Sequence, residues 1–453
     1  MRALPRDRSI YKMKDTEKKP KKVRSDIVRD SINTFGTNAI GSLLSIISAF
    51  FVLGVLDPGV KGQYNQVQLV GNGLFTLFGF SINAAMIYFV SRFKIKNTVS
   101  AIRKLTIAMS VLILVAGTAA VVFMKEIFFP GSTAFYCWAA VIYGLFSFLL
   151  NVCLAILRGE NKFKSFNTIN LLQKVLLTAF MFSMLVFPSA WLLVTSMIGI
   201  QILMIAFAIY SIIRWNGKEP APAPEDDLPV QTSAMFRYSL KSHVSNVMTY
   251  INSYLGSYIV NAVYSLSTFG IYNAAVTMMQ QVWLLPDAVS QVIMSRIAAM
   301  REKEDKVRLT LMSCKVVTYI TIVCAVLLVV VAQLFVPIVF PKYVDAIAPL
   351  RYLIIGSIFI CYAKVLANSI AAYGKPELNI LPTIVGIIVN LVLVLYLIPL
   401  MGVNGIALAT SASLTVQGLT SMIIFCVFTR TPFYRLLIPN GEEIRTVAQI
   451  FKK

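Results

Sequence analysis

The sequence contains little charge. Only 13% of its 453 residues are Asp, Glu, Lys or Arg, whereas 57% are hydrophobic. A soluble domain carries about 25% charged residues, so the composition excludes a soluble globular protein. The mean hydropathy of +0.75 instead predicts an all-α, polytopic membrane protein.

Residues that bind metals or act in catalysis are also scarce. The chain has one histidine, His243, and its six cysteines form no CxxC pair. Metal sites need clusters of His and Cys at short spacing, so we expect no metal and no cofactor. The sequence has no GxxxxGK[ST] motif, which excludes a P-loop ATPase within the chain. The expected outer loops are short and lack a His or Glu cluster, so we expect that the protein is not an enzyme.

Long apolar runs dominate the chain instead. A helix needs about 20 largely apolar residues to cross a bilayer, and the sequence has twelve such runs. They lie near residues 32–56, 66–90, 105–124, 134–157, 166–187, 190–213, 236–264, 269–294, 312–335, 347–372, 378–399 and 403–428. The sequence therefore predicts twelve transmembrane helices.

The positions of Lys and Arg predict how these helices are oriented. The chain has 41 Lys and Arg against 20 Asp and Glu, and in membrane proteins such an excess collects in cytoplasmic loops. If the N-terminus is cytoplasmic, 32 of the 41 basic residues lie in inner segments, one of which is the expected loop at 92–104. Four lie in outer segments: Lys61 in the loop between the first two spans, Lys125, Lys342 and Arg351. We therefore expect a multi-pass protein of the cell (plasma/inner) membrane with both termini in the cytoplasm.

Residues 215–235 divide the spans into two sets of six. This segment is rich in Pro, Ala and acidic residues, which is typical of a flexible linker. The predicted organisation is a basic cytoplasmic tail (1–30), an N-terminal six-helix bundle (31–214), the linker (215–235), a C-terminal six-helix bundle (236–428) and a second cytoplasmic tail (429–453).

The two halves share a sequence repeat at a shift of 208 residues. A G-x-Y-N motif at residues 62–65 recurs at residues 270–273, directly after the opening span of each half. Because six is an even number, both halves run in the same direction. The repeat therefore predicts two six-helix bundles around a central cleft, related by an axis along the membrane normal, with a substrate site between them.

Polar residues form stripes on the first and seventh spans. In the first span Asn38 begins a series at helical spacing that continues through Ser42, Ser45 and Ser48. The seventh span carries His243, Asn246, Tyr250 and Asn252. Small polar residues also let helices pack closely, and that interpretation stays open for the first span. For the seventh span we favour a hydrated cavity.

Four lysines lie within predicted spans, and we expect one of them, Lys315, to extend to the interface. Lys174 is about eight residues, or roughly 12 Å, inside the fifth span; Lys364 lies at a similar depth in the tenth, and Lys241 lies near the inner end of the seventh. Such lysines can extend to the interface, and Asp287 of the eighth span can pair with one of them. If they instead face the interior, their ammonium groups create a cavity that attracts phosphate. The other three lysines and the polar residues of the two stripes are the candidate substrate-binding residues.

Three stretches resemble a known family. They are GVLDPGVKGQYNQ (54–66), LRGENKFKSFNTINLLQKVL (157–176) and YGKPELNILPTIVGIIVNLVLVLYLIPLMGVNGIALAT (373–410). With the arrangement of spans, they resemble the multidrug/oligosaccharidyl-lipid/polysaccharide exporter superfamily and, within it, the Wzx-type polysaccharide flippases. The resemblance implies a V-shaped bundle that opens alternately to each side of the membrane, with the first and seventh spans lining its cleft.

The resemblance also implies a function. A flippase of this type carries an undecaprenyl-pyrophosphate-linked oligosaccharide, such as an O-antigen, capsule or exopolysaccharide repeat unit, from the inner to the outer leaflet. The partners that it suggests are this glycan lipid, the bilayer, a polysaccharide polymerase and glycosyltransferases, and no nucleic acid. The alternative is a cation-coupled multidrug and toxin extrusion antiporter. A third possibility, a membrane glycosyltransferase or polymerase, lacks an acidic catalytic pair.

Overall fold

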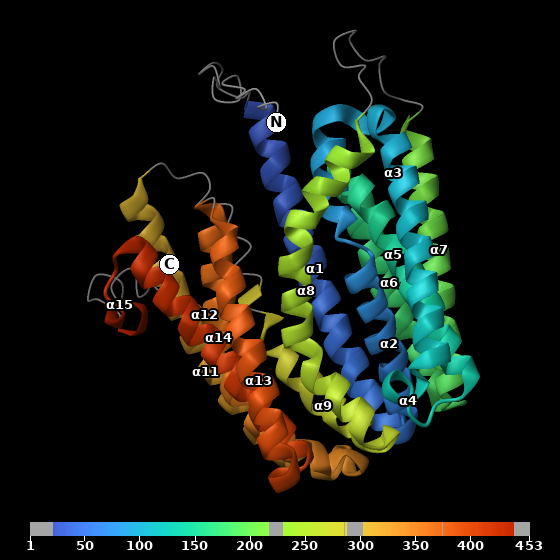
Figure 1. The fold of residues 1–453 in the computed structure, drawn as a ribbon, viewed down its shortest axis with the longest axis vertical. Helices are drawn as coiled ribbons and strands as arrows, with labels where there is room; N and C mark the ends of the chain where they lie inside the picture. The colour runs from blue at the N-terminus through green and yellow to red at the C-terminus, as the bar shows by residue number, and fades with distance from the viewer. Residues whose placement is uncertain (1–20, 217–229, 285, 288–301, 374, 439–453) are drawn as a thin grey trace, which may run out of the picture.

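The protein is built from helices alone in the part of the chain that the structure describes. This computed structural model describes residues 21–216, 230–284, 286–287, 302–373 and 375–438. Every regular element within these ranges is a helix, and none is a strand (Figure 1). The all-α fold class expected from the composition is therefore confirmed.

The helices before the linker, which we call the first half, run back and forth between two ends of the molecule. They are α1 (Lys21–Val55), α2 (Pro58–Phe78), α3 (Ile82–Phe123), α4 (Lys125–Phe128), α5 (Ala134–Gly159), α6 (Phe163–Phe182), the 3₁₀ turn η2 (Ser183–Leu185) and α7 (Ala190–Asn216). We call the end where α1 begins and α7 ends the linker end, at the top of Figure 1. The opposite end, where α1 is followed by α2, is the turn end.

The second half follows the same plan after the linker. It contains α8 (Thr232–Val263), α9 (Leu266–Gln281), α11 (Lys303–Val339), η4 (Pro341–Ala346), α12 (Ile347–Ala372), η5 (Pro376–Asn379), α13 (Ile380–Met401), α14 (Val403–Thr429) and α15 (Tyr434–Leu437). In Figure 1, α11 to α14 form one group and α1 to α7 another, with α8 and α9 between them. The ribbons of the two groups meet at the turn end and diverge toward the linker end.

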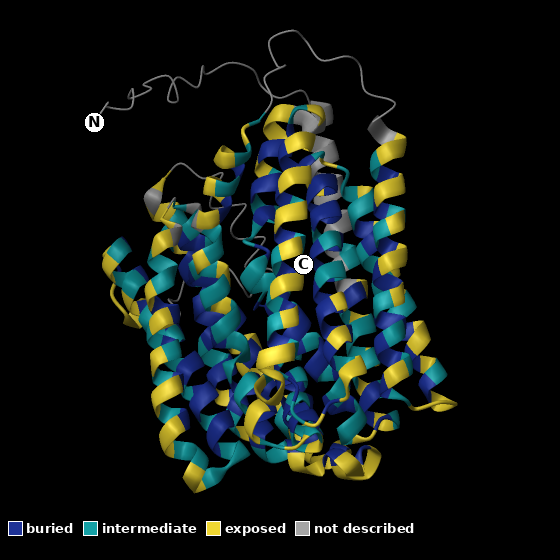
Figure 2. Ribbon diagram, turned by 45° about the vertical axis from the view of Figure 1, so that its right-hand side comes forward, coloured by how far each residue is buried: buried dark blue, intermediate teal, exposed yellow. Residues whose placement is uncertain are grey.

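The length and surface of the helices are those of a multi-pass membrane protein. Among the described residues, eight helices are long and apolar enough to cross a bilayer, or nine if a bent pair counts as one span. Large apolar side chains lie exposed on the outer faces of these helices, such as Ile338 on α11 and Leu395 on α13 (Figure 2). Apolar side chains are suited to contact with lipid tails. The backbone polar groups need no outside partner there, because they bond to one another within each helix. The count of twelve spans stays a prediction, as do the domain boundaries.

Two expectations about the first half were wrong. Residues 58–65 were expected in an outer loop, but α2 begins at Pro58, since proline is favoured in the first turn of a helix. The second and third runs were expected as separate spans, which agrees with a bent pair, Pro58–Phe78 with Ile82–Phe93, and a separate apolar span at Lys96–Phe123. The inner segment at 92–104 between them was expected as a loop. That segment is helical instead, because residues 92–104 contain neither Pro nor Gly and α3 continues through them. The chain breaks within the second span, at Gly79, with a bend of 54° between Pro58–Phe78 and Ile82–Phe93.

The repeated G-x-Y-N motif forms a close backbone contact between the halves. A Cβ atom at Gly62 on α2 would overlap the carbonyl oxygen of Leu266, the first residue of α9, and a Cβ at Gly270 on α9 would overlap that of Pro58, the first residue of α2. Leu266 lies 208 residues after Pro58, so both contacts follow the shift of the sequence repeat. We call this contact the glycine crossing; it brings the two halves together at the turn end.

Substitution at the glycine crossing tests this packing. We expect Gly62→Ala and Gly270→Ala each to destabilise the protein by about 1–3 kcal/mol, the usual effect of overpacking, because the added methyl group meets backbone that cannot rotate away. Thermal unfolding in detergent measures the effect. Gly59→Ala is the matched control, since a Cβ there has nothing within 4 Å. Equal unfolding midpoints for all three variants would contradict the crossing.

Candidate functional site

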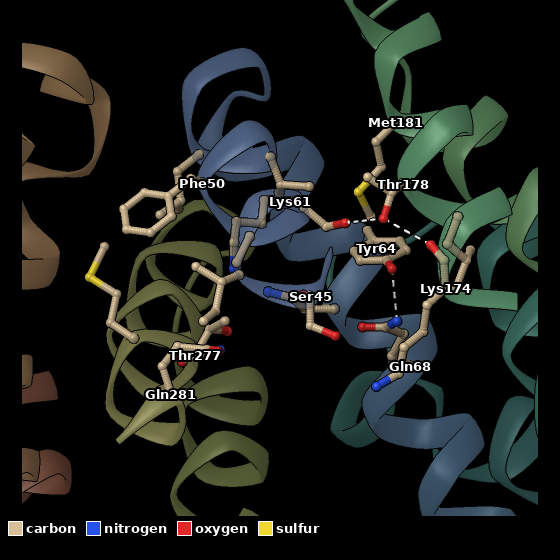
Figure 3. Close-up of a pocket in the computed structure, with 18 of the residues that line it drawn as sticks. Ser45, Phe50, Lys61, Tyr64, Gln68, Lys174, Thr178, Met181, Thr277 and Gln281 are labelled. Atoms are coloured by element: carbon tan, nitrogen blue, oxygen red, sulfur yellow. Dashed lines mark hydrogen bonds between the residues drawn. The ribbon is translucent and has the colours of Figure 1, made fainter. Parts of the chain in front are cut away.

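A cavity of about 390 Å³ lies between the two halves (Figure 3). Its walls come from α1, α2 and α6 of the first half and from α9 and α11 of the second half. The polar residues that line it are Ser45, Ser48, Lys61, Tyr64, Asn65, Gln68, Lys174, Thr178, Thr277 and Gln281. None of the described lining residues is acidic, so the only formal charges on its wall are those of two lysines.

Lys174 is the predicted lysine that reaches this cavity. It extends from α6 toward Gln68 on α2 (Figure 3). A Cβ on Gly41 of α1 would lie 2.9 Å from the Lys174 Nζ, so the missing side chain at Gly41 leaves room for the ammonium group. One turn further along α6, Thr178 shares a 2.7 Å hydrogen bond with Ser48 on α1. The polar stripe of α1 therefore faces α6 and the cavity at Ser45 and Ser48.

Lys61 is the second cation, and its side chain is only 4% exposed. It comes from the first turns of α2, beside Gly62 of the glycine crossing. Its Nζ donates to the carbonyl oxygen of Gly270 on α9 at 3.5 Å, a long hydrogen bond. Burial of an ammonium group costs free energy unless it is well compensated, and this one carbonyl compensates it weakly.

Neutral amides add further hydrogen-bonding groups to the cavity wall. The Nδ2 of Asn65 and the Oε1 of Gln281 are buried, and neither has a hydrogen-bond partner among the described residues. Gln68 uses its Nε2 to donate to the Tyr64 hydroxyl at 2.8 Å. An unpaired amide N–H beside two ammonium groups favours an anion with several acceptor oxygens.

The rest of the wall is apolar. Phe50 and Leu53 of α1, Met181 of α6, Met278 of α9 and Leu328 of α11 all contribute to it. Phe50 is 48% exposed on the outer side of α1, and its ring stacks on Phe340 at the end of α11, with centroids 6.0 Å apart. The cavity is therefore amphipathic, because cationic groups and an apolar surface face the same space.

Lys364 lies elsewhere and has a partner. Its Nζ is 2.7 Å from the Oδ1 of Asp287 and 4.7 Å from the centre of the Trp283 ring. This is the ion pair that the sequence analysis left open for Asp287. Lys364 does not line the cavity, and the pair neutralises its charge.

Three candidates of the seventh span contact the first half. The His243 ring stacks on Phe80, with centroids 4.6 Å apart, and Asn246 donates to the Ser81 hydroxyl at 3.0 Å. Phe80 and Ser81 both have positive φ values, 48° and 50°, at the break between α2 and α3. Tyr250 donates to the carbonyl oxygen of Leu69 on α2 at 2.9 Å. These three side chains hold α8 against α2 and its break, away from the cavity.

Asn252 is fixed within the second half. Its Nδ2 donates to Gln417 at 2.7 Å, and its Oδ1 accepts from Ser413 at 2.8 Å, both on α14. The side chain is 2% exposed, so Asn252 joins α8 to α14. The side chains of Asn38 on α1 and Lys241 on α8 lie outside the described part of the structure.

The sequence analysis missed Lys61 because it placed this residue in an outer loop. Pro58, directly after Asp57, is a signal for a helix start. With the helix begun there, Lys61, Asn65 and Gln68 fall at positions i, i+4 and i+7 on one helical face. All three line the cavity, so the signal was present in the sequence.

The fold of the chain is similar to those of solved structures of transporters. The lipid II flippase MurJ in an inward closed conformation matches with a TM-score of 0.66 and 17% identity, over 90% of this chain and 89% of that chain. An inward-facing multidrug resistance MATE family transporter of the MOP superfamily matches with a TM-score of 0.65 and 15% identity, over 90% and 98%. An outward-facing MATE structure of the same superfamily gives a TM-score of 0.54 at 15% identity, over 90% and 96%. The fold is thus that of the superfamily that the sequence resembles.

The sequence itself identifies the family. Residues 74–348, more than half of the chain, match the family model described as polysaccharide biosynthesis protein, and the chain belongs to that family. No curated protein matches it significantly. The protein is therefore a polysaccharide biosynthesis family member with the multi-span fold of MOP-superfamily transporters and flippases.

A double-mutant cycle tests whether the ion pair between Lys364 and Asp287 stabilises the protein. We expect the destabilisations caused by Lys364→Met and by Asp287→Asn to add up to more than that of the double variant, because each single change leaves one charge unpaired. The coupling between contacting residues is about 0.5–3 kcal/mol, and the low end applies here because Asp287 is 46% exposed. Unfolding midpoints of the four proteins measure it. Strictly additive effects would show that the pair contributes nothing.

Proposed function

We propose that the protein is a flippase of undecaprenyl-pyrophosphate-linked oligosaccharide. In this proposal the glycan lipid moves from the inner to the outer leaflet of the cytoplasmic membrane by alternating access, with both termini of the protein in the cytoplasm. The protein transports its substrate and performs no catalysis. The single observation that carries the proposal is the amphipathic cavity lined by Lys61 and Lys174 and by no acidic side chain among the described residues.

The chemistry of the cavity matches that of a polyprenyl diphosphate. A diphosphate carries several negative charges and acceptor oxygens, which ammonium and amide N–H groups bind as charge-assisted hydrogen bonds. The prenyl chain is apolar and suits the wall formed by Phe50, Leu53 and Leu328. In a low-dielectric surrounding, the attraction between such charges is stronger than in water.

The arrangement of the halves supports alternating access. The glycine crossing joins them at the turn end, which is the outer end if the predicted topology holds. The TM-score is also higher against the inward-facing MATE transporter, 0.65, than against the outward-facing one, 0.54. We therefore propose that this structure represents a state closed to the outside.

The remaining candidate residues have two roles in this proposal. Lys174 binds the diphosphate directly. His243, Asn246, Tyr250 and Asn252 position α8 between the halves through the contacts described above. Asn38, Lys241 and Lys364 stay candidates for contact with the glycan during the cycle. The polymerase and glycosyltransferases of the same polysaccharide are the proposed partner enzymes.

The alternative is a cation-coupled multidrug antiporter, which shares the fold. An organic cation in this cavity would meet two ammonium groups and no carboxylate among the described lining residues. Like charges in a poorly hydrated site repel each other. The electrostatics of the cavity therefore favour the anionic cargo.

Neutralising Lys174 tests the proposed function. Lys174→Gln should reduce flipping of an undecaprenyl-pyrophosphate glycan about tenfold or more, because a hydrogen bond to a charged group contributes about 1.5–3 kcal/mol. The measurement is glycan exposed on the outer leaflet of liposomes that contain the purified protein. Lys125→Gln is the control, since Lys125 is exposed on α4 and lies outside the cavity.

Two results would refute the proposal. One is full glycan flipping by the Lys174→Gln variant. The other is wild-type protein that moves ethidium-like cations but leaves the glycan lipid in place, which would establish the antiporter instead.

A further inference from the structure

Lys61 belongs to two structural features at once. Its ammonium group lines the cavity, and it also donates across the boundary between the halves to the Gly270 carbonyl oxygen on α9. Gly270 is one of the two glycines of the crossing. A change in the position of this single side chain therefore affects both the charge of the cavity and the contact that closes the turn end.

Other contacts also join the halves at the turn end. Gln66 of α2 uses its Nε2 to donate to the Asn261 Oδ1 on α8 at 2.8 Å, and Asn261 uses its Nδ2 to donate to the Phe128 carbonyl oxygen at 3.0 Å. Tyr343 of η4 donates its hydroxyl to the Leu56 carbonyl oxygen at 3.0 Å. Lys342 forms an ion pair with Asp57 at 2.6 Å, but both side chains are more than half exposed, and such pairs contribute about 0–1 kcal/mol. The Phe50 ring stacks on Phe340, and the glycine crossing packs α2 against α9. Among these contacts, the long bond from Lys61 is made by a charged group that also lines the cavity, so a ligand in the cavity can compete for it.

We propose that an anion in the cavity opens the turn end through Lys61. At 3.5 Å from a neutral carbonyl, the ammonium group gains more from a phosphate oxygen than from Gly270. An anion that draws the Lys61 side chain into the cavity removes its contact with α9 and weakens the crossing. The halves then separate at the turn end only when the cavity is occupied.

This inference rests on the proposed function and adds the residue that couples cargo to opening. In thermodynamic terms the anion binds more tightly to the open state than to the closed state, and that difference in affinity limits how far the equilibrium can shift. Lys174 has no such contact across the crossing in the described structure. It comes from α6 and lies against α1, so both of its neighbours belong to the first half. Lys174 therefore contributes to the affinity for the anion only. Lys61 contributes to that affinity and also couples anion binding to opening of the turn end.

The experiment measures opening at the crossing while the cavity is filled. Cysteines are introduced at Gly59 on α2, where a side chain meets nothing, and at Ser267 on α9, which is exposed. The exposed Cys324 is replaced by serine. The full-length protein in nanodiscs reacts with a short bifunctional thiol reagent, and intact mass distinguishes the crosslinked product from the doubly labelled one. Farnesyl diphosphate is the ligand, and farnesol is its uncharged control.

With wild-type lysines, saturating farnesyl diphosphate should lower the crosslinked-to-doubly-labelled ratio about fivefold, the low end of common allosteric coupling. Farnesol should leave the ratio unchanged. In the Lys174→Met background, binding should weaken about tenfold, but the ratio should still fall at saturation. In the Lys61→Met background, binding should also weaken, and the ratio should not respond even at saturation. Lys61→Gln, which keeps an N–H for the Gly270 carbonyl, should likewise not respond.

The outcomes separate this inference from the proposed function. If farnesyl diphosphate binds to the wild type but leaves the ratio unchanged, or if either Lys61 variant responds like the wild type, coupling through Lys61 is wrong and the flippase proposal stands. If neither farnesyl diphosphate nor the glycan lipid binds, the proposed function fails. If neither Lys61 variant yields folded protein, Lys61 is a structural residue and the coupling is rejected.

Discussion

The contact of α2 with α9 at Gly62 and Gly270 is the constraint on which the rest of the structure depends. Gly62 and Gly270 have no side chains, so the backbones of the two helices touch directly. This close approach brings the first turns of α2 and α9 together. Lys61, one residue before Gly62, is thereby placed against the Gly270 carbonyl oxygen and beside the cavity. A larger residue at either glycine would push the helices apart and remove both the contact and the wall that α9 gives to the cavity. The cationic site and the closed turn end therefore share one physical origin.

The two halves repeat the backbone but differ in charge. At the shift of 208, Lys61 corresponds to Phe269, which is fully buried among apolar residues of the second half. At the shift of 215, seen between Gly159 and Gly374, Lys174 corresponds to Val389. Asn65 leaves its Nδ2 without a partner among the described residues, whereas the corresponding Asn273 donates to Phe269 and accepts from Ser257. The fold thus supplies two similar scaffolds, and the sequence puts the anion-attracting groups of this cavity on the first of them.

Much of the fold was predictable because the relevant signals are strong over long segments. Apolar runs of bilayer length, the basic linker end and the G-x-Y-N repeat each follow from composition or register.

The site was harder to predict. Lys174 was found because a charge inside a span is conspicuous, but Lys61 was hidden by a boundary error at Pro58. For Lys364 the sequence showed a buried charge and, 77 residues away, a carboxylate, and only the packing of the chain brings them to 2.7 Å. His243 and Asn252 make contacts between helices in this structure, and a polar stripe on one helix cannot distinguish such contacts from a binding face.

A cargo with a charged head and an apolar tail must keep both parts satisfied while the head crosses the membrane. A cavity that is only cationic would hold the head too well and exclude the tail, and a wholly apolar one would leave the diphosphate without partners at a large cost in free energy. In this protein the ammonium groups of Lys61 and Lys174 face a space whose other wall contains Phe50 and Leu328 near the outer surface of the bundle. Release also requires that the cations lose their hold at the far side. Lys61 has the Gly270 carbonyl oxygen as an alternative partner. In the cycle that we propose, closing of the crossing after release returns the ammonium group to that carbonyl and limits the free-energy cost of an empty cationic cavity. In this proposal, the weak bond that an anion displaces is also the one that restores the closed state.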